Sequence, residues 1–188
     1  MRSTKKELKR LRYTFLNEIV DTRALKDFKQ SIEVLGKKVG PFKAGNHYRM
    51  EFWVAKTFLI NDILQLTEKD KLDVQKIQKI AYKESRSRKI EKIDENLFLA
   101  IHEYLDVLNE RVKRNLTKER KFKDVYSNVQ DLVIVRQRKV GNLSQTKHTI
   151  RKIQNLAASE KVLIEHLSGT FEGWGQFFLE DIKEKNKR

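Results

Sequence analysis

The sequence predicts a mainly α protein in which a small N-terminal β-containing domain precedes a helical-bundle domain. Apolar side chains alternate from Tyr48 to Phe52, the period of a strand, and recur at helical spacing from Trp53 onward. The only proline and three of the seven glycines lie between residues 28 and 66, which is typical of short strands joined by turns. Beyond this stretch, apolar stripes at helical spacing dominate the sequence.

The change of pattern divides the chain into two predicted domains. Residues 1–65 form the small α+β domain, with an N-terminal helix and short strands. Residues 66–188 form the helical-bundle domain. At 188 residues the chain is long enough to bury a core in this arrangement.

An amphipathic helix is predicted at about residues 4–20. Thr4 and Glu7 have the spacing of a capping box. Apolar residues on one face follow at helical spacing: Leu8, Leu11, Phe15 and Ile19. The other face carries cations: Lys5, Lys6, Lys9, Arg10 and Arg12.

Two short strands are predicted next, at residues 32–35 and 47–52. Turn residues separate them: Gly36, Gly40-Pro41 and Gly45-Asn46. The second strand passes directly into the helix that begins at Trp53.

The second domain is predicted as a series of helices with polar caps and apolar stripes. Thr67 or Asp70 caps the first helix, and Asp94 caps the next, which extends to Val112. The polar, basic segment of residues 83–92 lies between them.

A long helix is predicted to begin near Asp124, with Ile150 and Leu156 continuing its apolar stripe. Gly141-Asn142 is expected to kink or break this helix. The last helix starts at Ser159, and the glycines around Trp174 are expected to loosen it.

Charge and cysteine content limit the possible partners. An excess of 41 Lys+Arg over 26 Asp+Glu gives a net charge of +15, which favours nucleic acid, an acidic protein or an anionic membrane surface. A solvated, highly charged surface without a dedicated partner is the alternative.

The absence of cysteine excludes disulfides and thiolate metal sites. Neither a signal peptide nor an apolar run of membrane-spanning length is present, so we expect an intracellular protein.

No motif for catalysis stands out in the sequence. His102-Glu103 begins like a zinc-protease motif, but Asp106 occupies the position of the second histidine. Carboxylates such as Glu84, Glu103 and Asp106 could hold a magnesium ion, since Glu103 and Asp106 share a helical face. Solvated ion pairs are favoured in so charged a chain. We therefore expect no enzymatic activity, no cofactor and no bound metal.

A basic stretch covers residues 111–123, in which Glu119 is the only acid. Such a density of like charge predicts an exposed loop or a frayed helix end. It supports sequence-independent contact with nucleic-acid phosphates, and a solvated loop is the open alternative. The cations are Arg111, Lys113, Arg114, Lys118, Arg120, Lys121 and Lys123.

The segment MEFWVAKTFL, residues 50–59, resembles the strand-to-helix junction of GINS subunits in which the small β domain precedes the helical domain. The family pattern there is approximately Leu-Pro-Leu-Trp-Leu-Ala, followed by an amphipathic helix. Matching residues are Met50, Phe52, Trp53, Val54 and Ala55. Glu51 departs from the pattern, because it stands where the family often has proline.

Two later segments add to the resemblance. Glu84, followed by a helix that opens with Leu97-Phe98, resembles the family's glutamate and its next helix. The segment Val125–Val140 resembles a core helix tipped with basic residues, here Arg136, Arg138 and Lys139. The likeness covers most of residues 28–157 and rests on the order of the three motifs.

The resemblance implies a non-enzymatic scaffold subunit of an archaeal GINS-type complex in DNA replication. Its partners would be a second GINS subunit in a 2:2 heterotetramer, the MCM helicase and a RecJ-like protein, with DNA contact left open. Such a complex is cytoplasmic and associated with the nucleoid. The alternative from charge alone is a stand-alone, basic, helical nucleic-acid-binding protein.

Two sets of residues have expected roles. Met50, Phe52, Trp53 and Ala55 are expected to pack the domain junction, with Trp53 as the wedge between the β unit and the helices. Candidates for subunit contacts or ion pairs are Glu84, Arg136, Arg138 and Lys139. The three cations can instead meet phosphates or remain solvated.

Overall fold

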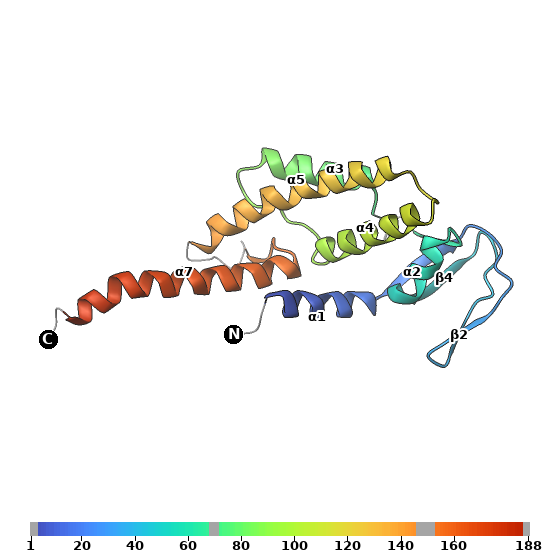
Figure 1. Cartoon of the computed structure of the whole chain (residues 1–188), viewed down its shortest axis with the longest axis horizontal. Coiled ribbons are helices and arrows are strands. Elements are labelled where there is room, and N and C mark those ends of the chain that lie inside the picture. Colours follow the sequence, from blue (N-terminus) through green and yellow to red (C-terminus); the bar gives the residue numbers. More distant parts are fainter. Residues whose placement is uncertain (1–3, 68–71, 146–152, 186–188) are drawn as a thin grey trace.

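The computed structural model describes residues 4–67, 72–145 and 153–185. It is elongated, with a small sheet at one end and helices along the rest (Figure 1). The chain is mainly α, with its strands before the long helices, as the sequence predicts. Asp70 and Ile150, which the sequence analysis assigns to helices, lie outside the described residues.

The sheet is built around a strand that the sequence analysis misses. β1 (Ile19–Ala24) lies between β4 (His47–Glu51) and β5 (Leu64–Leu66), and both pairings are antiparallel. The predicted helix over residues 4–20 is therefore too long, because α1 (Thr4–Leu16) ends before β1 begins. Ile19 continues the helical stripe in sequence, but its side chain is 62% exposed on the strand.

The predicted strand at 32–35 is present as β2 (Ile32–Val34), which pairs only with β3 (Lys37–Val39). Among the described residues this hairpin is separate from the three-stranded sheet. The sequence analysis also misses β5, because it directly follows the apolar helix α2 (Phe52–Ile60). Asp62, with a φ of 53°, reverses the chain between α2 and β5.

Four long helices form the rest of the described structure: α3 (Val74–Arg86), α4 (Leu97–Lys113), α5 (Glu119–Ser144) and α7 (Ala158–Lys185). α5 packs against α3, α4 and α7, and α1 packs against α4 and α7. The cap of α3 is Asp73, whose carboxylate accepts a hydrogen bond from the Lys76 amide at 2.8 Å, and not Thr67.

Two predictions about helix continuity are wrong. α5 begins at Glu119, before the predicted start, and passes through Gly141 without a break. It ends at Ser144, so Leu156 does not continue its apolar stripe as predicted. Its first turns are supported by the pair Lys123–Glu119 at 2.9 Å and by the stacked rings of Phe122 and Tyr126, which offset the local repulsion between cations. α7 likewise continues through its glycines.

The buried side chains form connected clusters. The first lies between the sheet, α1, α2 and α4, and includes Phe42, whose ring is 4.9 Å from that of Phe58. The second joins α3, α4 and α5 around Ile77 and Leu132. α4 contributes to both clusters, so the β unit and the helices share a continuous interior. The predicted domain boundary after residue 65 falls inside β5.

Candidate interaction surfaces

The strand-to-helix junction is a packing site. Phe52 is buried with its ring centroid 5.4 Å from that of Phe15, and Ala55 is fully buried. Trp53 and Met50 are half-buried against the same cluster. Phe52, the first residue of α2, therefore occupies the central position that the sequence analysis assigns to Trp53. Burial of a large aromatic ring contributes about 2–3 kcal/mol to stability.

A buried ion-pair cluster, which we call the Arg136 cluster, joins α3, α5 and the start of α7. The Arg136 guanidinium is 1% exposed and donates to Glu160 at 2.7 and 2.5 Å and to Glu84 at 3.1 Å. It also donates to the carbonyls of Glu91 and Asn155 at 2.8 and 3.3 Å. All five N–H donors of the guanidinium therefore have an acceptor.

Lys139 completes this cluster, with Nζ 2.5 Å from the Glu84 carboxylate and 2.9 Å from the Lys89 carbonyl. Burial acts to lower the pKa of Arg136, but the hydrogen bonds and charges of Glu160 and Glu84 leave it raised. Three of the candidate residues thus meet inside the chain. Arg138, the fourth, is exposed on α5 and does not join them.

Sequence reasoning does not find Glu160, although a local signal exists. Glu160 is the third residue of α7, and its carboxylate accepts a hydrogen bond from the Ala157 amide at 2.9 Å. This is the position from which a glutamate reaches back to the residue that caps a helix. The same carboxylate holds Arg136, so the helix start and the cluster are fixed together.

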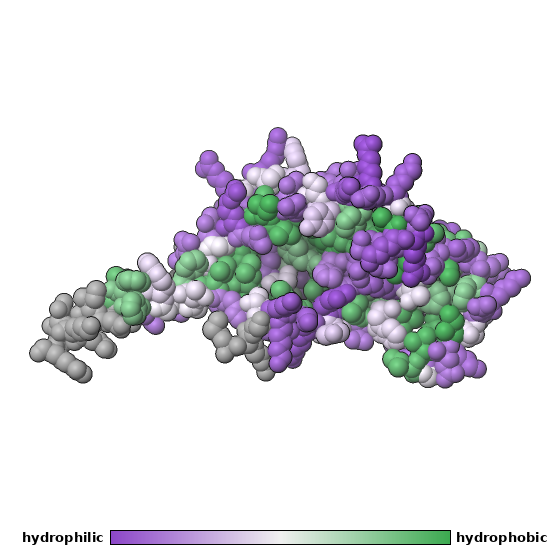
Figure 2. Space-filling model, in the orientation of Figure 1, coloured by the Kyte–Doolittle hydropathy of each residue, from purple (hydrophilic) through white to green (hydrophobic). Residues whose placement is uncertain are grey.

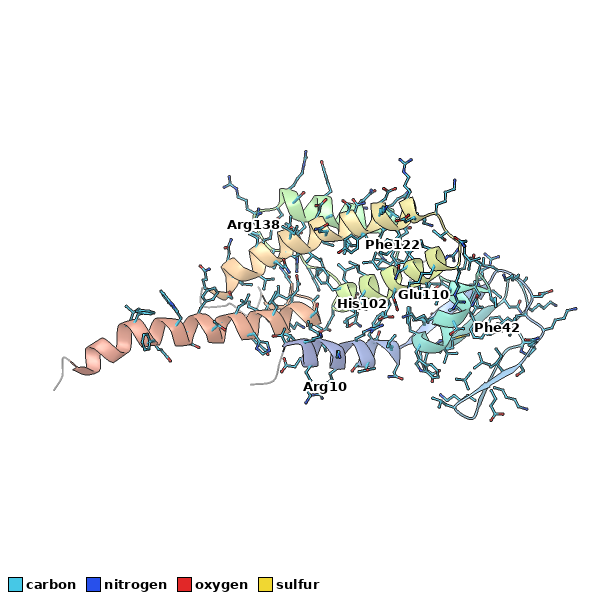
Figure 3. The ribbon with its side chains drawn as sticks, viewed as in Figure 1. Arg10, Phe42, His102, Glu110, Phe122 and Arg138 are labelled. Carbon is cyan, nitrogen blue, oxygen red and sulfur yellow. The ribbon has the colours of Figure 1, made fainter. Side chains whose placement is uncertain are left out.

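A second cluster, the Glu103 cluster, ties α1, α2 and α4 together. The fully buried Glu103 carboxylate accepts hydrogen bonds from Lys56 at 2.6 Å and from Arg12. Lys56 also contacts Asp106. Figure 3 labels His102, the residue before Glu103 on α4. Burial acts to raise the pKa of Glu103, but the hydrogen bonds from Arg12 and Lys56 leave it lowered. The hydrogen bond from Lys56 lowers the pKa of Asp106.

This arrangement bears on the magnesium alternative for Glu103 and Asp106. Lys56 and Arg12 occupy the carboxylate oxygens that a metal would need. Across the described ranges, no group of three or more histidines, cysteines or acids is placed to hold a metal ion. The two carboxylates of α4 pair with Arg12 of α1 and Lys56 of α2, and so connect the β unit to the helices.

The basic stretch of residues 111–123 is divided by the structure. Arg111 lies within α4, is partly buried and donates to both Asp62 oxygens, at 2.5 and 2.8 Å, so it is a structural ion pair and not part of an exposed loop. Arg114 donates to the Asn61 side chain at 3.1 Å, and Lys113 pairs with Glu110 at 2.7 Å.

Four cations of that stretch lie at the start of α5: Lys118, Arg120, Lys121 and Lys123. All four are exposed. Lys118 immediately precedes α5, and the other three lie within it. On the same helix, Lys123 pairs with Glu119 and Arg120 with Asp124. The stretch therefore does not form one continuous basic loop.

The far half of α7 exposes an apolar face that the sequence analysis misses. Trp174 is 67% exposed and Phe177 66% exposed, and Phe178 packs against both rings at centroid distances of 4.8 and 5.0 Å. Phe171 and Leu179 are also exposed. The helix extends beyond the other helices, and hydrophobic residues appear on this extension (Figures 1 and 2).

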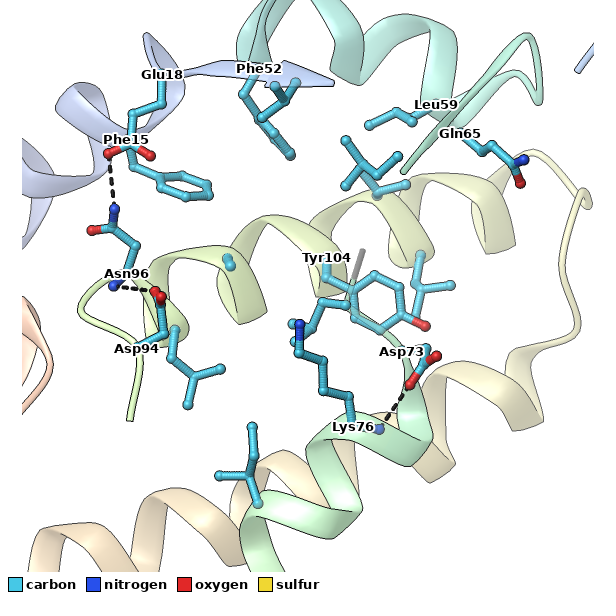
Figure 4. Close-up of a pocket in the computed structure, with 18 of the residues that line it drawn as sticks. Phe15, Glu18, Phe52, Leu59, Gln65, Asp73, Lys76, Asp94, Asn96 and Tyr104 are labelled. Carbon is cyan, nitrogen blue, oxygen red and sulfur yellow. Dashed lines mark hydrogen bonds between the residues drawn. The ribbon is translucent and has the colours of Figure 1, made fainter. Parts of the chain in front are cut away.

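A cleft of about 880 Å³ lies between the sheet, α3 and α4. Figure 4 shows Phe15, Phe52 and Tyr104 along it, with Asp73 capping α3. The Glu18 carboxylate, also on its wall, accepts from the Asn96 amide at 2.9 Å. Its acids are thus engaged in structural contacts, and the geometry does not assemble a nucleophile with a base.

Comparisons with known proteins do not supply an identity. Neither the protein-family models nor the characterised proteins compared with this chain match it. In the part of the chain that the structure describes, no helix combines the length and the apolar character needed to cross a bilayer.

Proposed function

We propose that this chain is a non-enzymatic scaffold subunit of a GINS-like DNA replication complex, associated with the nucleoid in the cytoplasm. Its sister subunit would carry the two domains in the opposite order, in a 2:2 heterotetramer. The assembly would dock on the MCM helicase and on a RecJ-like protein. The resemblance at residues 50–59, at Glu84 and at Val125–Val140 supports this proposal, together with an order of elements in which the sheet precedes the long helices.

One observation carries the subunit role: the exposed apolar side chains on the far half of α7, of which Phe171, Trp174 and Phe178 share one side, with Phe177 and Leu179 flanking them. Each fully buried aromatic side chain removes about 150–250 Å² from water. Because the four aromatic residues are only 41–67% exposed, burying them would remove on the order of 400 Å² from water, about half of what one partner contributes to a standard interface of ~800 Å² per side. Solvent exposure of such a face is unfavourable in an isolated chain.

The glycines of α7 fit a close partner helix. No described atom lies within 4 Å of a Cβ placed at Gly169 or Gly173, so neither residue is required by packing inside the chain. Each costs the helix about 0.5–1 kcal/mol relative to alanine. Four residues apart, they lie on one side of α7, the side that carries Phe177, and leave room for another backbone.

The Arg136 and Glu103 clusters suit a protein that positions others. They fix α1, α2, α3, α4, α5 and the start of α7 by charged hydrogen bonds in the interior or near it. A scaffold needs such fixed relative placement of its surfaces, whereas the described residues offer no catalytic arrangement. The function would be to hold and orient the helicase and its partners.

The test is the solution mass, by size exclusion with light scattering, of the chain alone and after co-expression with the helical-domain-first GINS homologue of the same host. We expect a stable 2:2 assembly. The double substitution Trp174→Ser with Phe178→Ser should reduce it to smaller species. Ile134→Ser, which changes an apolar side chain that is 45% exposed on α5, is the control and should leave the mass unchanged.

The glycine substitution Gly173→Ala sharpens this experiment. It should raise the helix content or stability of the chain alone by ~0.5–1 kcal/mol while weakening the assembly. A chain that ignores the sister subunit would overturn the family assignment. A chain that assembles equally well with both α7 variants would retain the scaffold role but remove α7 from the interface.

A second candidate function is the stand-alone nucleic-acid-binding protein, which the net charge of +15 favours. It predicts a monomer in the same mass measurement. The two functions are therefore separated by oligomeric state before any nucleic acid is added.

A further inference from the structure

The outward face of α1 carries a group of exposed cations that the proposed scaffold role leaves unused. We define it by Lys5, Lys6, Lys9, Arg10 and Tyr13, all of which are exposed. Arg10 points away from the body of the molecule (Figure 3). Tyr13 is 66% exposed, so an aromatic ring lies beside the cations. A shallow groove runs along this face, lined also by Glu7, Thr14 and Asn17.

The two sides of α1 use their charges differently. On the inward side, Arg12 bonds to Glu103, and Glu7, at the border between the two sides, lies 3.4 Å from His166 of α7. Phe15 is buried in the first cluster. These contacts hold α1 in place, so the cations of the outward face are not needed to dock it. None of these cations has an acidic partner in the described part of the chain.

The outward face is unfavourable for the helix itself. Lys5 with Lys9 and Lys6 with Arg10 are like-charge pairs four residues apart, which destabilise a helix. Lys5 and Lys6 also lie in the first turn, where the positive end of the helix dipole disfavours cations. Both unfavourable terms are relieved by a bound polyanion.

We propose that the outward face of α1 binds single-stranded nucleic acid, with Lys5, Lys6, Lys9 and Arg10 on the phosphates and Tyr13 stacked on a base. From Lys6 to Tyr13 the helix rises about 10 Å, enough to contact several consecutive phosphates. An aromatic ring among cations is the combination that binds single strands without sequence preference. This inference does not rest on the proposed assembly.

The α1 face differs from the cations at the start of α5. There Lys123 and Arg120 face Glu119 and Asp124 on the same helix, at 2.9 and 3.9 Å. The local positive charge is therefore partly neutralised. This contrast provides a control with the same number of cations removed from another part of the surface.

The experiment measures binding of a fluorescent oligo-dT to the full chain by anisotropy, over a series of salt concentrations. The α1 triple variant, Lys6→Gln with Lys9→Gln and Arg10→Gln, should weaken binding at least tenfold at low salt. It should reduce the slope of log affinity against log salt by about two, since each phosphate contact on a single strand contributes ~0.7. The α5 triple variant, Lys118→Gln with Lys121→Gln and Lys123→Gln, should change the affinity less than threefold.

The variant Tyr13→Ala tests the stacking contact. It leaves the charge unchanged, so the salt slope should persist while the affinity for oligo-dT falls roughly fivefold or more. Affinity for a duplex of the same length should not change. Circular dichroism checks that each variant keeps its helices, which we expect because all substituted side chains are exposed.

Several outcomes would overturn the inference. One is a parent chain that does not bind oligo-dT even at low salt, and another is equal weakening by the two triple variants, which would indicate diffuse attraction. Unchanged affinity in Tyr13→Ala would also contradict it. Binding of the α1 face to phosphatidylserine vesicles, without binding to oligo-dT, would assign the face to a membrane surface instead.

Discussion

The Arg136 cluster and the Glu103 cluster are both ion-pair networks, but they differ in burial and in redundancy. Arg136 is 1% exposed and is the sole cation paired with Glu160 among the described residues, whereas Glu84 also pairs with Lys139. In the Glu103 cluster, two cations share Glu103 and Asp106, and Arg12 is 36% exposed. The first network is closed to water, whereas the second is open on one side.

Their places in the fold differ as well. The Arg136 cluster lies wholly among the long helices and fixes the segment around Asn155 to α5. The Glu103 cluster connects Lys56 of α2, next to the sheet, with Arg12 of α1 and with α4. Removing charge from the first should damage the bundle itself, and removing charge from the second should loosen the β unit.

The number of ion pairs in a cluster therefore does not determine how much that cluster contributes to the free energy of unfolding. A buried charge that loses its sole partner keeps its full desolvation cost, whereas a carboxylate with two cations keeps one of them. Arg12 is also partly exposed, so it is hydrated and screened and its contribution is reduced. The two networks therefore predict effects of different size for equivalent substitutions.

The largest effect is expected for Arg136→Met, which leaves Glu84 and Glu160 buried without their shared cation. Loss of one member of a buried ion pair costs about 3–5 kcal/mol of the free energy of unfolding. Urea denaturation followed by circular dichroism measures this change. Lys139 keeps one contact with Glu84, so the bundle should still fold.

Arg138→Met is the matched control, because it removes the same charge from the same helix at an exposed position. It should leave the denaturation midpoint almost unchanged. If both variants lost similar stability, net charge rather than the buried cluster would be responsible. A loss below 1 kcal/mol in Arg136→Met would mean that the cluster relaxes into another set of contacts.

A smaller effect is expected for Lys56→Met, because Arg12 still neutralises Glu103. Loss of a hydrogen bond to a charged group lowers the free energy of unfolding by about 1.5–3 kcal/mol. We expect the lower end of this range, because Glu103 keeps its other cation. Lys29→Met, at an exposed lysine, is the control for the change of charge. A loss as large as that of Arg136→Met would show that the two clusters are not different in redundancy.

Much of the fold follows from local patterns in the sequence. The alternation before Phe52 and the helical spacing after it predict the boundary between β4 and α2 within one residue. β1 is missed because Ile19 fits the spacing of α1 by chance and the strand is paired on both sides by distant segments. A kink or break is predicted at Gly141, but Val140 and Leu143 beside it pack against Leu156 and Ile164, and α5 has no break there.

The candidate surfaces are less predictable than the fold. Glu84 is identified as an ion-pair candidate from the resemblance alone. Glu160, which shares Arg136 with it, is not identified, because only the packing of α3, α5 and α7 brings the two carboxylates to the same guanidinium. Arg111 and Arg12 are read as surface cations, because the acids that hold them are distant in sequence. The aromatic face of α7 is missed because the glycines suggest a loosened chain.

The smallest effect, and the most specific to the Glu103 cluster, is on stability in acid. The pKa of Glu103 is lowered in the folded chain, so its contribution is complete above the ordinary value of 4.5 and is lost as the pH falls through the folded pKa. Glu103→Gln should therefore be less stable than the parent at pH 7. The two stability curves should converge below pH 4.5, where the parent carboxylate becomes protonated. Denaturation midpoints measured from pH 7 to pH 3 test this, with exposed Glu33→Gln as the control. Curves that remain parallel down to pH 3 would mean that the charge of Glu103 does not stabilise the junction, and the open cluster would then act only through its packing.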